Sequence, residues 1–215
     1  MENIWNDDPR CLIVAPLYQG EEREIMKGRK EDLLVCADGG FVRSEAYGLR
    51  PGLVVGDFDS MRDRAIPDTE VLRLPVHKDD TDMEVCIEEG RKRGFHTFVM
   101  AGALGGRADH MIGNLELLCR CARRHEHAWL MDAQNRLTML WPGTWQIDQM
   151  PGRKLSLAAW TPEVTGICLT GTEWPLQQAV LTHEDPVGIS NEFRRETAEL
   201  SFETGLLLVM LCRDA

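Results

Sequence analysis

Two aspartates separated by a single residue mark the first place in the sequence where metal chemistry is expected. They lie in the segment Val54-Val55-Gly56-Asp57-Phe58-Asp59-Ser60. Because side chains alternate between faces along a strand, Asp57 and Asp59 are predicted to project the same way from the end of an apolar strand. Two neighbouring carboxylates repel each other unless a cation lies between them, and open α/β sheets bind ligands at the carboxyl ends of their strands. The pattern fits a cation site and, equally, a solvated turn with two surface acids.

A second acidic segment is Lys78-Asp79-Asp80-Thr81-Asp82. Thr81 and Glu84 have the spacing of a capping box, and acids at a helix N-terminus are expected because they complement the helix dipole. Capping explains one or two of these aspartates but not the whole cluster. Mg²⁺ prefers oxygen ligands and keeps several waters, so a few carboxylates plus substrate phosphates complete its coordination. Lys78 beside them is placed to face a phosphate, although a solvated charge run has the same composition.

A glycine-rich turn over residues 102–110, with the sequence GALGGRADH, leads from an apolar run into a helical pattern. Glycines let a backbone approach a phosphate, and a helix N-terminus offers N–H donors to an anion. Arg107, His110 and Asn114 are spaced three and four apart and therefore share one helical face. The alternative is an ordinary turn before an amphipathic helix, with Asp109 as its cap. The chain has neither the Walker A nor the G-x-G-x-x-G phosphate-binding pattern.

The elements that must position these residues alternate between strand and helix over most of the chain. Apolar runs predict strands at 11–16, 33–37, 53–59, 70–74, 97–101, 129–132 and 137–141, and helical patterns predict helices at 41–49, 81–93 and 108–124. Runs without polar alternation are typical of a parallel sheet covered on both faces. The sequence therefore predicts an N-terminal α/β domain with a mostly parallel sheet, residues 1–143.

The pattern changes after Trp141. Residues 141–152 contain two Pro-Gly breaks and predict a linker. Beyond it, short strands are predicted at 154–160, 165–170, 187–190, 197–202 and 206–212, the last two joined as a hairpin through residues 203–205. This pattern predicts a C-terminal all-β sandwich domain, residues 152–215.

The overall composition excludes several classes of protein. The chain has 24 Lys and Arg against 35 Asp and Glu, a formal net charge of -11, which argues against nucleic acid as a partner. No apolar run approaches the ~18 residues of a membrane helix, and residues 1–10 lack the apolar core of a signal peptide. Seven cysteines without CxxC spacing fit a reducing compartment, so a cytoplasmic protein without a membrane partner is expected. A metal site at Cys119 and Cys121 is disfavoured, since thiols two residues apart on a helix point to different faces.

Taken together, these segments resemble the thiamine pyrophosphokinase family. The matching motifs are, in chain order, ADGG (37–40), GDFDS (56–60), KDxTD (78–82), GxxGGRxDH (102–110) with a following Asn114, and DxxN (132–135). Further on, GTEWPL (171–176) and GISNE (188–192) are similar to the family's G-L-x-W/Y-x-L and Ser-Asn motifs. Thr172 replaces the usual Leu, and Ile189 stands where some members have a Ser/Thr-rich run. Both departures bear on thiamine affinity more than on the chemistry.

The resemblance implies the two-domain fold predicted above, assembled as a homodimer with thiamine bound near the subunit interface. It also implies transfer of a diphosphate from ATP to the hydroxyl of thiamine, with Mg²⁺ as cofactor and release of AMP. The catalytic and Mg²⁺-binding set carried over from the family is Asp57, Asp59, Asp79 and Asp82, while Asp80 falls at a variable position. The nucleotide-binding set is Asp38, Gly39, Gly40, Lys78, Thr81, Gly105, Gly106, Arg107, Asp109, His110 and Asn114. Trp174 would stack on the pyrimidine of thiamine, and Ser190 and Asn191 would contact thiamine by hydrogen bonds.

Two other functions stay open at this point. A catalytically idle sensor of thiamine or nucleotide would keep the fold, but it would have no need of four matched aspartates. A pyrophosphokinase or nucleotidyltransferase acting on another alcohol would not be expected to keep Trp174 together with Ser190 and Asn191.

Overall fold

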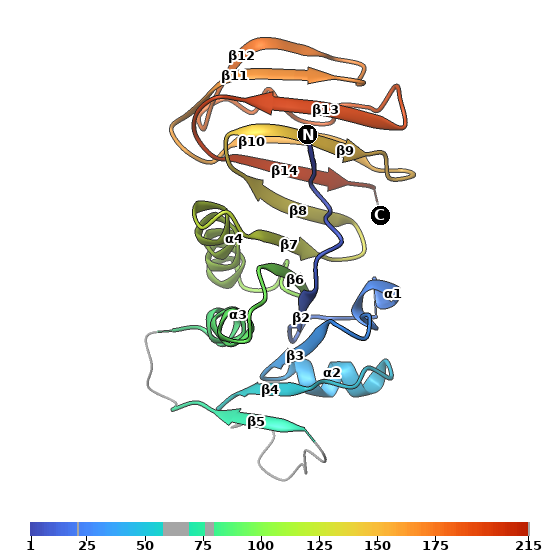
Figure 1. The fold of residues 1–215 in the computed structure, drawn as a ribbon, viewed down its shortest axis with the longest axis vertical. Helices are drawn as coiled ribbons and strands as arrows, with labels where there is room; N and C mark the ends of the chain where they lie inside the picture. Colours follow the sequence, from blue (N-terminus) through green and yellow to red (C-terminus); the bar gives the residue numbers. More distant parts are fainter. Residues whose placement is uncertain (21, 58–68, 76–79, 215) are drawn as a thin grey trace. The chain divides into compact units, whose positions relative to one another are not determined.

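The computed structural model describes residues 1–20, 22–57, 69–75 and 80–214. These residues form a mixed α/β protein with two β-sheets, shown in Figure 1. They cluster into two compact units, each drawn from separate stretches of the chain. The α/β unit comprises Asp8–Leu117 and Ala128–Ala133, and the β unit comprises Met1–Asp7, Leu118–His127 and Gln134–Ala215.

Parallel strands form the centre of the α/β unit. They are β2 (Arg10–Val14), β3 (Leu33–Ala37), β4 (Leu53–Gly56), β5 (Glu70–Arg73) and β6 (Thr97–Ala101), paired in the order β6-β2-β3-β4-β5. β7 (His127–Met131) lies beside β6. β2, β4 and β6 are buried along their whole length, as expected for parallel strands covered on both faces.

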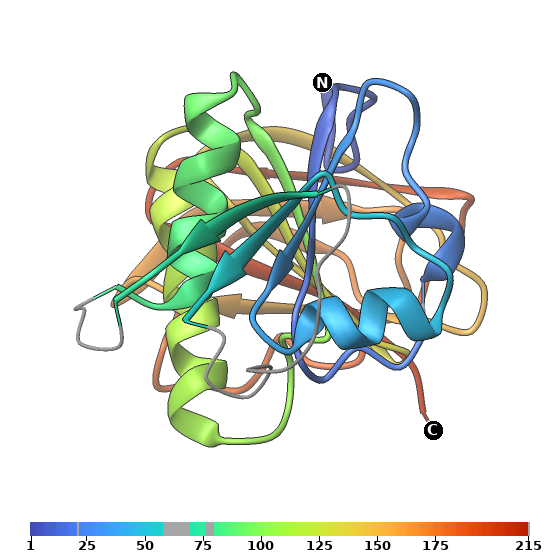
Figure 2. The same ribbon diagram turned by 90° about the horizontal axis from the view of Figure 1, so that it is seen from below.

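Helices cover both faces of these strands. α2 (Gly40–Ala46) lies on one side and α3 (Asp82–Lys92) on the other, as Figure 2 shows, and the short α1 (Arg23–Met26) precedes β3. α3 begins as the capping-box pattern predicted, because Thr81 is its N-cap and Thr81 Oγ1 accepts a hydrogen bond from the backbone N–H of Glu84 at 3.2 Å. α4 (Ala108–Arg123) follows the glycine-rich turn. Among the helices of the described residues, none combines the length and apolar character needed to span a bilayer.

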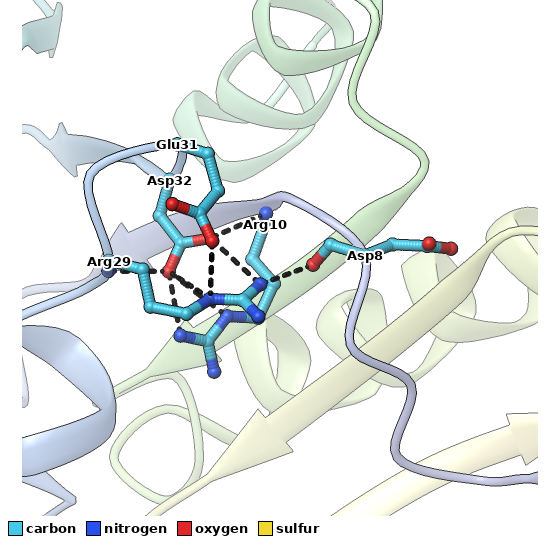
Figure 3. A network of polar contacts seen from close by, with 5 residues as sticks. All are labelled: Asp8, Arg10, Arg29, Glu31 and Asp32. Atoms are coloured by element: carbon cyan, nitrogen blue, oxygen red, sulfur yellow. Dashed lines mark hydrogen bonds and ion pairs between the residues drawn. The ribbon is translucent and has the colours of Figure 1, made fainter.

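A buried ion-pair network ties the start of β2 to the loop before β3 (Figure 3). The Asp32 side chain is 1% exposed and lies 2.6 Å from Arg10 Nη2. It also accepts hydrogen bonds from the backbone N–H groups of Arg10 and Arg29, both at 2.8 Å. The Arg29 guanidinium donates to the carbonyl oxygen of Asp8 and pairs with Glu31. Burial raises the pKa of Asp32, but the hydrogen bonds from Arg10 and Arg29 outweigh it and lower that pKa to about 2.

The β unit consists of antiparallel layers with one parallel edge pair. Its five-stranded sheet has the order β1 (Glu2–Asn3), β9 (Gly143–Asp148), β13 (Thr197–Phe202), β11 (Glu163–Thr170) and β12 (Leu176–Thr182), with β1 parallel to β9. A second antiparallel set pairs β10 (Lys154–Ala159) with β14 (Leu207–Cys212) and β14 with β8 (Asn135–Leu140). Alternate residues of β9 and β13 are buried, including Trp145, Ile147 and Leu200, so one face of the five-stranded sheet is apolar.

The predicted linker over residues 141–152 was wrong, because β9 occupies its centre. The two Pro-Gly pairs lie near the two ends of β9 and do not mark a linker between domains. The alternation of buried Trp145 and Ile147 with more exposed neighbours is a strand pattern that the turn residues on either side obscured.

Two further predictions for the C-terminal half were also wrong. Residues 187–190 form turns instead of a strand, and Gly188 packs so closely that a Cβ there would lie 2.2 Å from the carbonyl oxygen of Leu157. Residues 203–205 do not close a hairpin, because β13 pairs with β9 and β11 while β14 pairs with β10 and β8. The segment therefore passes from one sheet to the other. β1 and β12 were not predicted at all.

Candidate active site

A cavity of about 650 Å³ opens at the carboxyl ends of the parallel strands in the α/β unit. The strand order places β3 on one side of β2 and β6 on the other, so the chain reverses its direction of winding at β2. Ligands of open α/β sheets bind at such a topological switch point. The lining comes from the turns after β2, β3 and β6, the first residues of α3 and the start of α4: Ala15, Pro16, Leu17, Ala37, Asp38, Thr81, Asp82, Met83, Gly102, Ala103, Gly105, Gly106, Arg107, Asp109, His110, Gly113 and Asn114.

Most of the residues that were predicted from the sequence to bind the nucleotide line this cavity. From the predicted sets it gathers Asp38, Thr81, Asp82, Gly105, Gly106, Arg107, Asp109, His110 and Asn114. Gly39 and Gly40 adjoin the lining without being part of it. The predictions for Asp59, Lys78 and Asp79 fall outside the described residues.

Gly40 has a packing role of its own. A Cβ at this position would lie 2.0 Å from the carbonyl oxygen of Val14, so only glycine lets the start of α2 approach β2 this closely. Gly39 has more room, since its Cβ would meet Pro16 at 3.6 Å.

Asp38 and Asp57 follow the ends of two adjacent strands. Ala37 of β3 is in register with Val55 of β4, so Asp38 and Asp57 leave the sheet at the same edge. A Cβ on Gly56 would come within 3.1 Å of Asp38 Cα, which explains the glycine that precedes Asp57. Asp38 adopts a left-handed backbone conformation with φ 42°, a region that aspartate tolerates better than most residues.

The donor chemistry of this edge fits a hard divalent cation. Asp38 and Asp57 follow strand ends, Asp82 begins α3, and all three carry carboxylate oxygens, the ligands that Mg²⁺ prefers. Within the part of the chain that the structure describes, no three acidic, histidine or cysteine groups lie close enough together to form a metal site by themselves. The other two predicted ligands, Asp59 and Asp79, lie outside the described residues.

Arg107 and Asp109 form an exposed ion pair at the start of α4. The Arg107 Nη2 atom lies 2.6 Å from Asp109 Oδ2, and the two side chains are 73% and 64% exposed. The hydrogen bond from Arg107 lowers the pKa of Asp109, whose Oδ1 also accepts from the backbone N–H of His110 at 2.9 Å. An ion pair this exposed contributes little stability. Its guanidinium can therefore exchange the carboxylate for a phosphate group, which it binds with the same geometry.

The glycine-rich turn is held in place by α4. Asn114 is buried and donates from Nδ2 to the carbonyl oxygen of Ala103 at 2.7 Å. Gly102 has φ 73°, and a Cβ there would lie 2.1 Å from the backbone nitrogen of Tyr18. Gly105 and Gly106 also have positive φ, a conformation that glycine adopts without strain. The turn after β2 that Gly102 contacts was missed by the sequence analysis, because Ala15, Pro16 and Leu17 give no polar signal.

The β unit presents one exposed tryptophan. Trp174 is 58% exposed on the loop between β11 and β12, whereas Trp129 and Trp145 are buried and the other three tryptophans are partly buried. The carboxamide of Asn191 hydrogen-bonds both backbone polar groups of Trp174. Ser190 is exposed, has φ 65°, and donates its backbone N–H to Ser156 Oγ at 2.9 Å.

The parallel sheet, its switch-point cavity and the glycine-rich turn beside it are typical of α/β proteins that bind a ligand at the carboxyl ends of their strands. Two family models match the chain: the catalytic domain of thiamin pyrophosphokinase over residues 27–130 and its vitamin B1 binding domain over residues 144–207. The chain therefore belongs to the thiamine pyrophosphokinase family, whose members are transferases.

Known proteins of this family resemble the chain over nearly its whole length. Thiamine pyrophosphokinase of Bacillus subtilis is 26% identical over 218 residues, covering 99% of this chain and 98% of the relative. The crystal structure of thiamine pyrophosphokinase from Bacillus subtilis superposes with a TM-score of 0.86 at 28% identity, covering 96% of this chain and 100% of the other. That of thiamin pyrophosphokinase from Geobacillus thermodenitrificans gives a TM-score of 0.85 at 28% identity, covering 96% and 98%.

Proposed function

We propose that this chain transfers the terminal diphosphate of ATP to the hydroxyl of thiamine, giving thiamine diphosphate and AMP. The observation that carries the proposal is that one chain matches both the catalytic and the vitamin B1 binding models of the family. Most of the residues that line the cavity at the strand ends lie in the first matched region, and the exposed Trp174 lies in the second.

The two parts of the chain would have different functions. Residues 1–143 would form the ATP- and Mg²⁺-binding catalytic domain, and residues 152–215 the domain for thiamine binding and dimerisation. The antiparallel layers of the β unit are proposed to pack as a β-sandwich. The alternating burial along β9 and β13 and the burial of Leu207, Val209 and Leu211 in β14 support this arrangement, because the inner faces of a sandwich are apolar.

Phosphate binding falls to the turn after β6 and the start of α4. The backbone N–H groups around Gly105 and Gly106 and at the N-terminus of the long helix α4 offer donors to phosphate oxygens. Arg107 would leave its ion pair with Asp109 and bind a phosphate. His110 and Asn114 line the same cavity, while Lys78, Thr81 and the Asp38–Gly40 turn complete the proposed nucleotide site.

The chemistry is an in-line displacement at phosphorus. The thiamine hydroxyl oxygen bonds to the β-phosphorus of ATP, the bond from that phosphorus to the oxygen bridging the α-phosphate breaks, and AMP leaves with the bridging oxygen. The hydroxyl proton is released in the same reaction. Such transfers depend mainly on positioning and on neutralised charge. Mg²⁺, when bound by Asp57, Asp59, Asp79 and Asp82, would neutralise the charge of the polyphosphate.

Thiamine would bind at the exposed face of the β unit. The Trp174 ring would stack on its pyrimidine, and Ser190 and Asn191 would supply hydrogen bonds. The formal net charge of -11 favours the positively charged thiazolium ring. We also propose that the protein acts as a homodimer with this site near the subunit interface, which is supported by the exposed apolar residues Val187 and Ile189 beside Ser190.

A cytoplasmic location is proposed from the state of the cysteines. All seven are free thiols, as in a reducing compartment. Two of them, Cys11 and Cys36, are so deeply buried that desolvation raises their pKa to about 12.

An assay of AMP release with ATP, Mg²⁺ and thiamine tests the function. AMP and thiamine diphosphate are expected in equal amounts from the complete mixture, and neither product without thiamine or with EDTA added. Thiamine binding by calorimetry without any turnover would replace this function with that of a sensor. The absence of both turnover and binding would show that the acceptor is not thiamine.

A further inference from the structure

Asn191 uses most of its side chain inside the protein. Its Oδ1 accepts hydrogen bonds from the backbone N–H groups of Trp174 at 3.1 Å and Glu192 at 2.9 Å. Its Nδ2 donates to the carbonyl oxygen of Trp174 at 2.7 Å. One carboxamide, on a residue that is 9% exposed, therefore satisfies both backbone polar groups of Trp174.

The backbone of Asn191 is itself fixed to β10, the strand at the edge of its sheet. Asn191 and Leu155 of β10 exchange both of their backbone hydrogen bonds, at 2.8 and 2.9 Å. The neighbouring Gly188 accepts from the N–H of Leu157 at 2.8 Å. Asn191 therefore connects the Trp174 loop to β10, which pairs along its whole length with β14.

The Trp174 ring stands out from this well-anchored backbone. The residue is 58% exposed, although its peptide groups are held by Asn191 and, more weakly, by Thr172 Oγ1 at 3.4 Å from its carbonyl oxygen. A ring presented to solvent from a fixed backbone loses less conformational freedom when a ligand stacks on it. This arrangement favours flat, aromatic ligands.

We propose that Asn191 is a positioning residue, which holds Trp174 in the orientation that stacks on thiamine and acts mainly through Trp174. The inference rests on the proposed function of the Trp174 ring. Asn191, the Asn of the Ser-Asn motif, thereby has a role other than direct contact with thiamine. The carboxamide of Asn191 makes three hydrogen bonds within the protein.

The test compares Asn191→Asp with a neighbouring control, Glu192→Gln. Asn191→Asp keeps the shape and the acceptor atoms but turns the donor toward the Trp174 carbonyl into a carboxylate oxygen. The Glu192 side chain pairs at the surface with Lys154 at 3.5 Å, and the hydrogen bond of Glu192 to Asn191 uses only its backbone. Glu192→Gln therefore leaves the carboxamide bonds to Trp174 intact.

The first readout needs no substrate. In protein labelled with 5-fluorotryptophan, the Trp174 fluorine resonance is assigned as the one that disappears in Trp174→Phe. Asn191→Asp is expected to shift or broaden this resonance while the other five stay in place, and Glu192→Gln is expected to leave all six unchanged. An unmoved Trp174 resonance in Asn191→Asp would overturn the inference. If Asn191→Asp does not fold, Asn191→Ser is measured in its place, since it removes the carboxamide and all three of its hydrogen bonds without adding a charge.

The second readout is steady-state kinetics. Asn191→Asp is expected to raise the KM for thiamine at least ten-fold, with kcat and the KM for ATP within two-fold of the unmodified enzyme. The ratio of the thiamine KM of Asn191→Asp to that of the unmodified enzyme should shrink as the pH falls. The reason is that the protonated carboxyl group of this variant can again donate a hydrogen bond to the Trp174 carbonyl. Equal increases in the KM for thiamine and the KM for ATP would contradict the inference that Asn191 positions Trp174. A raised KM for thiamine with an unmoved Trp174 resonance would also contradict it. If the unmodified protein shows no turnover, the proposed function fails, and the fluorine spectrum still decides whether Asn191 holds Trp174.

Discussion

The backbone N–H of Asp38 donates to the carbonyl oxygen of Val55 at 2.7 Å, at the point where β3 and β4 both end. This bond extends the pairing of the two strands by one residue beyond Ala37. It therefore fixes the turn carrying Asp38 against the strand that leads into Asp57. The position of Asp38 and Asp57 at one edge of the sheet is a direct product of strand register, and the chemistry of this edge can be tested by changing charge without changing shape.

Replacing Asp57 with asparagine should abolish most of the activity. The substitution removes one ligand charge and hardly any volume, so we expect kcat to fall by about 100-fold or more while the melting temperature stays within about 2 °C. AMP release and thermal denaturation measure the two effects. Asp80→Asn is the matched control, since Asp80 is exposed and lies outside the predicted ligand set, and it should keep nearly full activity. A fully active Asp57→Asn enzyme would rule out Asp57 as a metal ligand.

Removing the exposed indole should affect one substrate only. Trp174→Ala is expected to raise the KM for thiamine by about ten-fold or more, because stacking of a cationic aromatic ligand on tryptophan is worth about 1–2 kcal/mol. The KM for ATP should change less than two-fold. Trp174→Phe retains an aromatic ring, so its KM for thiamine should fall between those of the unmodified enzyme and Trp174→Ala. Similar changes in both KM values would argue against stacking on thiamine.

The buried network around Asp32 should stabilise the α/β unit. Asp32→Asn leaves the Arg10 guanidinium, whose side chain is 9% exposed, without its charged partner. We expect the free energy of unfolding at pH 7 to fall by about 3 kcal/mol, as for other broken buried ion pairs. Urea denaturation measures the change. Glu31→Gln is the control, since that side chain is 49% exposed and should contribute less than about 0.5 kcal/mol.

The same network predicts a pH dependence. The pKa of Asp32 is lowered to about 2 in the folded protein, whereas an unfolded aspartate titrates near about 3.9. A depressed pKa stabilises the fold fully above the unfolded value, and the contribution is lost as the pH falls from about 4 toward 2. The difference in stability between the unmodified protein and Asp32→Asn should therefore shrink between about pH 5 and pH 2. A difference that stays constant over this range would show that the Asp32 charge has no part in stability.

Two glycine-to-alanine substitutions should change stability in opposite directions. Gly40→Ala places a methyl group 2.0 Å from the carbonyl oxygen of Val14, which forces α2 away from β2 and should cost about 2 kcal/mol or more. Gly113→Ala lies within α4, where a Cβ would meet nothing within 4 Å, and should stabilise the protein by up to about 1 kcal/mol. Melting temperatures of the two variants decide the matter. A neutral Gly40→Ala would mean that α2 can move without cost.

Much of the α/β unit could be predicted because its signals are local. β3 and β6 have the predicted bounds, since buried parallel strands appear in a sequence as short continuous apolar runs. The start of α3 followed from Thr81 and Glu84, whose hydrogen bond spans three residues. The family resemblance placed Asp38, Asp82 and the glycine-rich turn at a common nucleotide and metal site, and these residues line one cavity.

The features that the sequence could not predict depend on distant partners. β9 was hidden by the proline–glycine pairs at its two ends. The passage of the chain from β13 to β14 is decided by which strands lie on either side, and no residue within 203–205 encodes that choice. The hydrogen bonds of Asn191 depend on Leu155, which is far away in the sequence, so a motif that suggested ligand contact could not reveal its part in holding Trp174.

The parallel pairing of β1 with β9 has a consequence for how the chain folds during synthesis. Glu2 pairs with Trp145 and Asn3 with Gln146, so these two residues bind a strand that the ribosome makes more than a hundred residues later. At about 5–20 residues per second, this delay is on the order of ten seconds. Strands β2 to β6 of the α/β unit are therefore synthesised before β9, the strand with which β1 pairs. The β1 edge of the β unit can therefore form only after the ribosome has made β9.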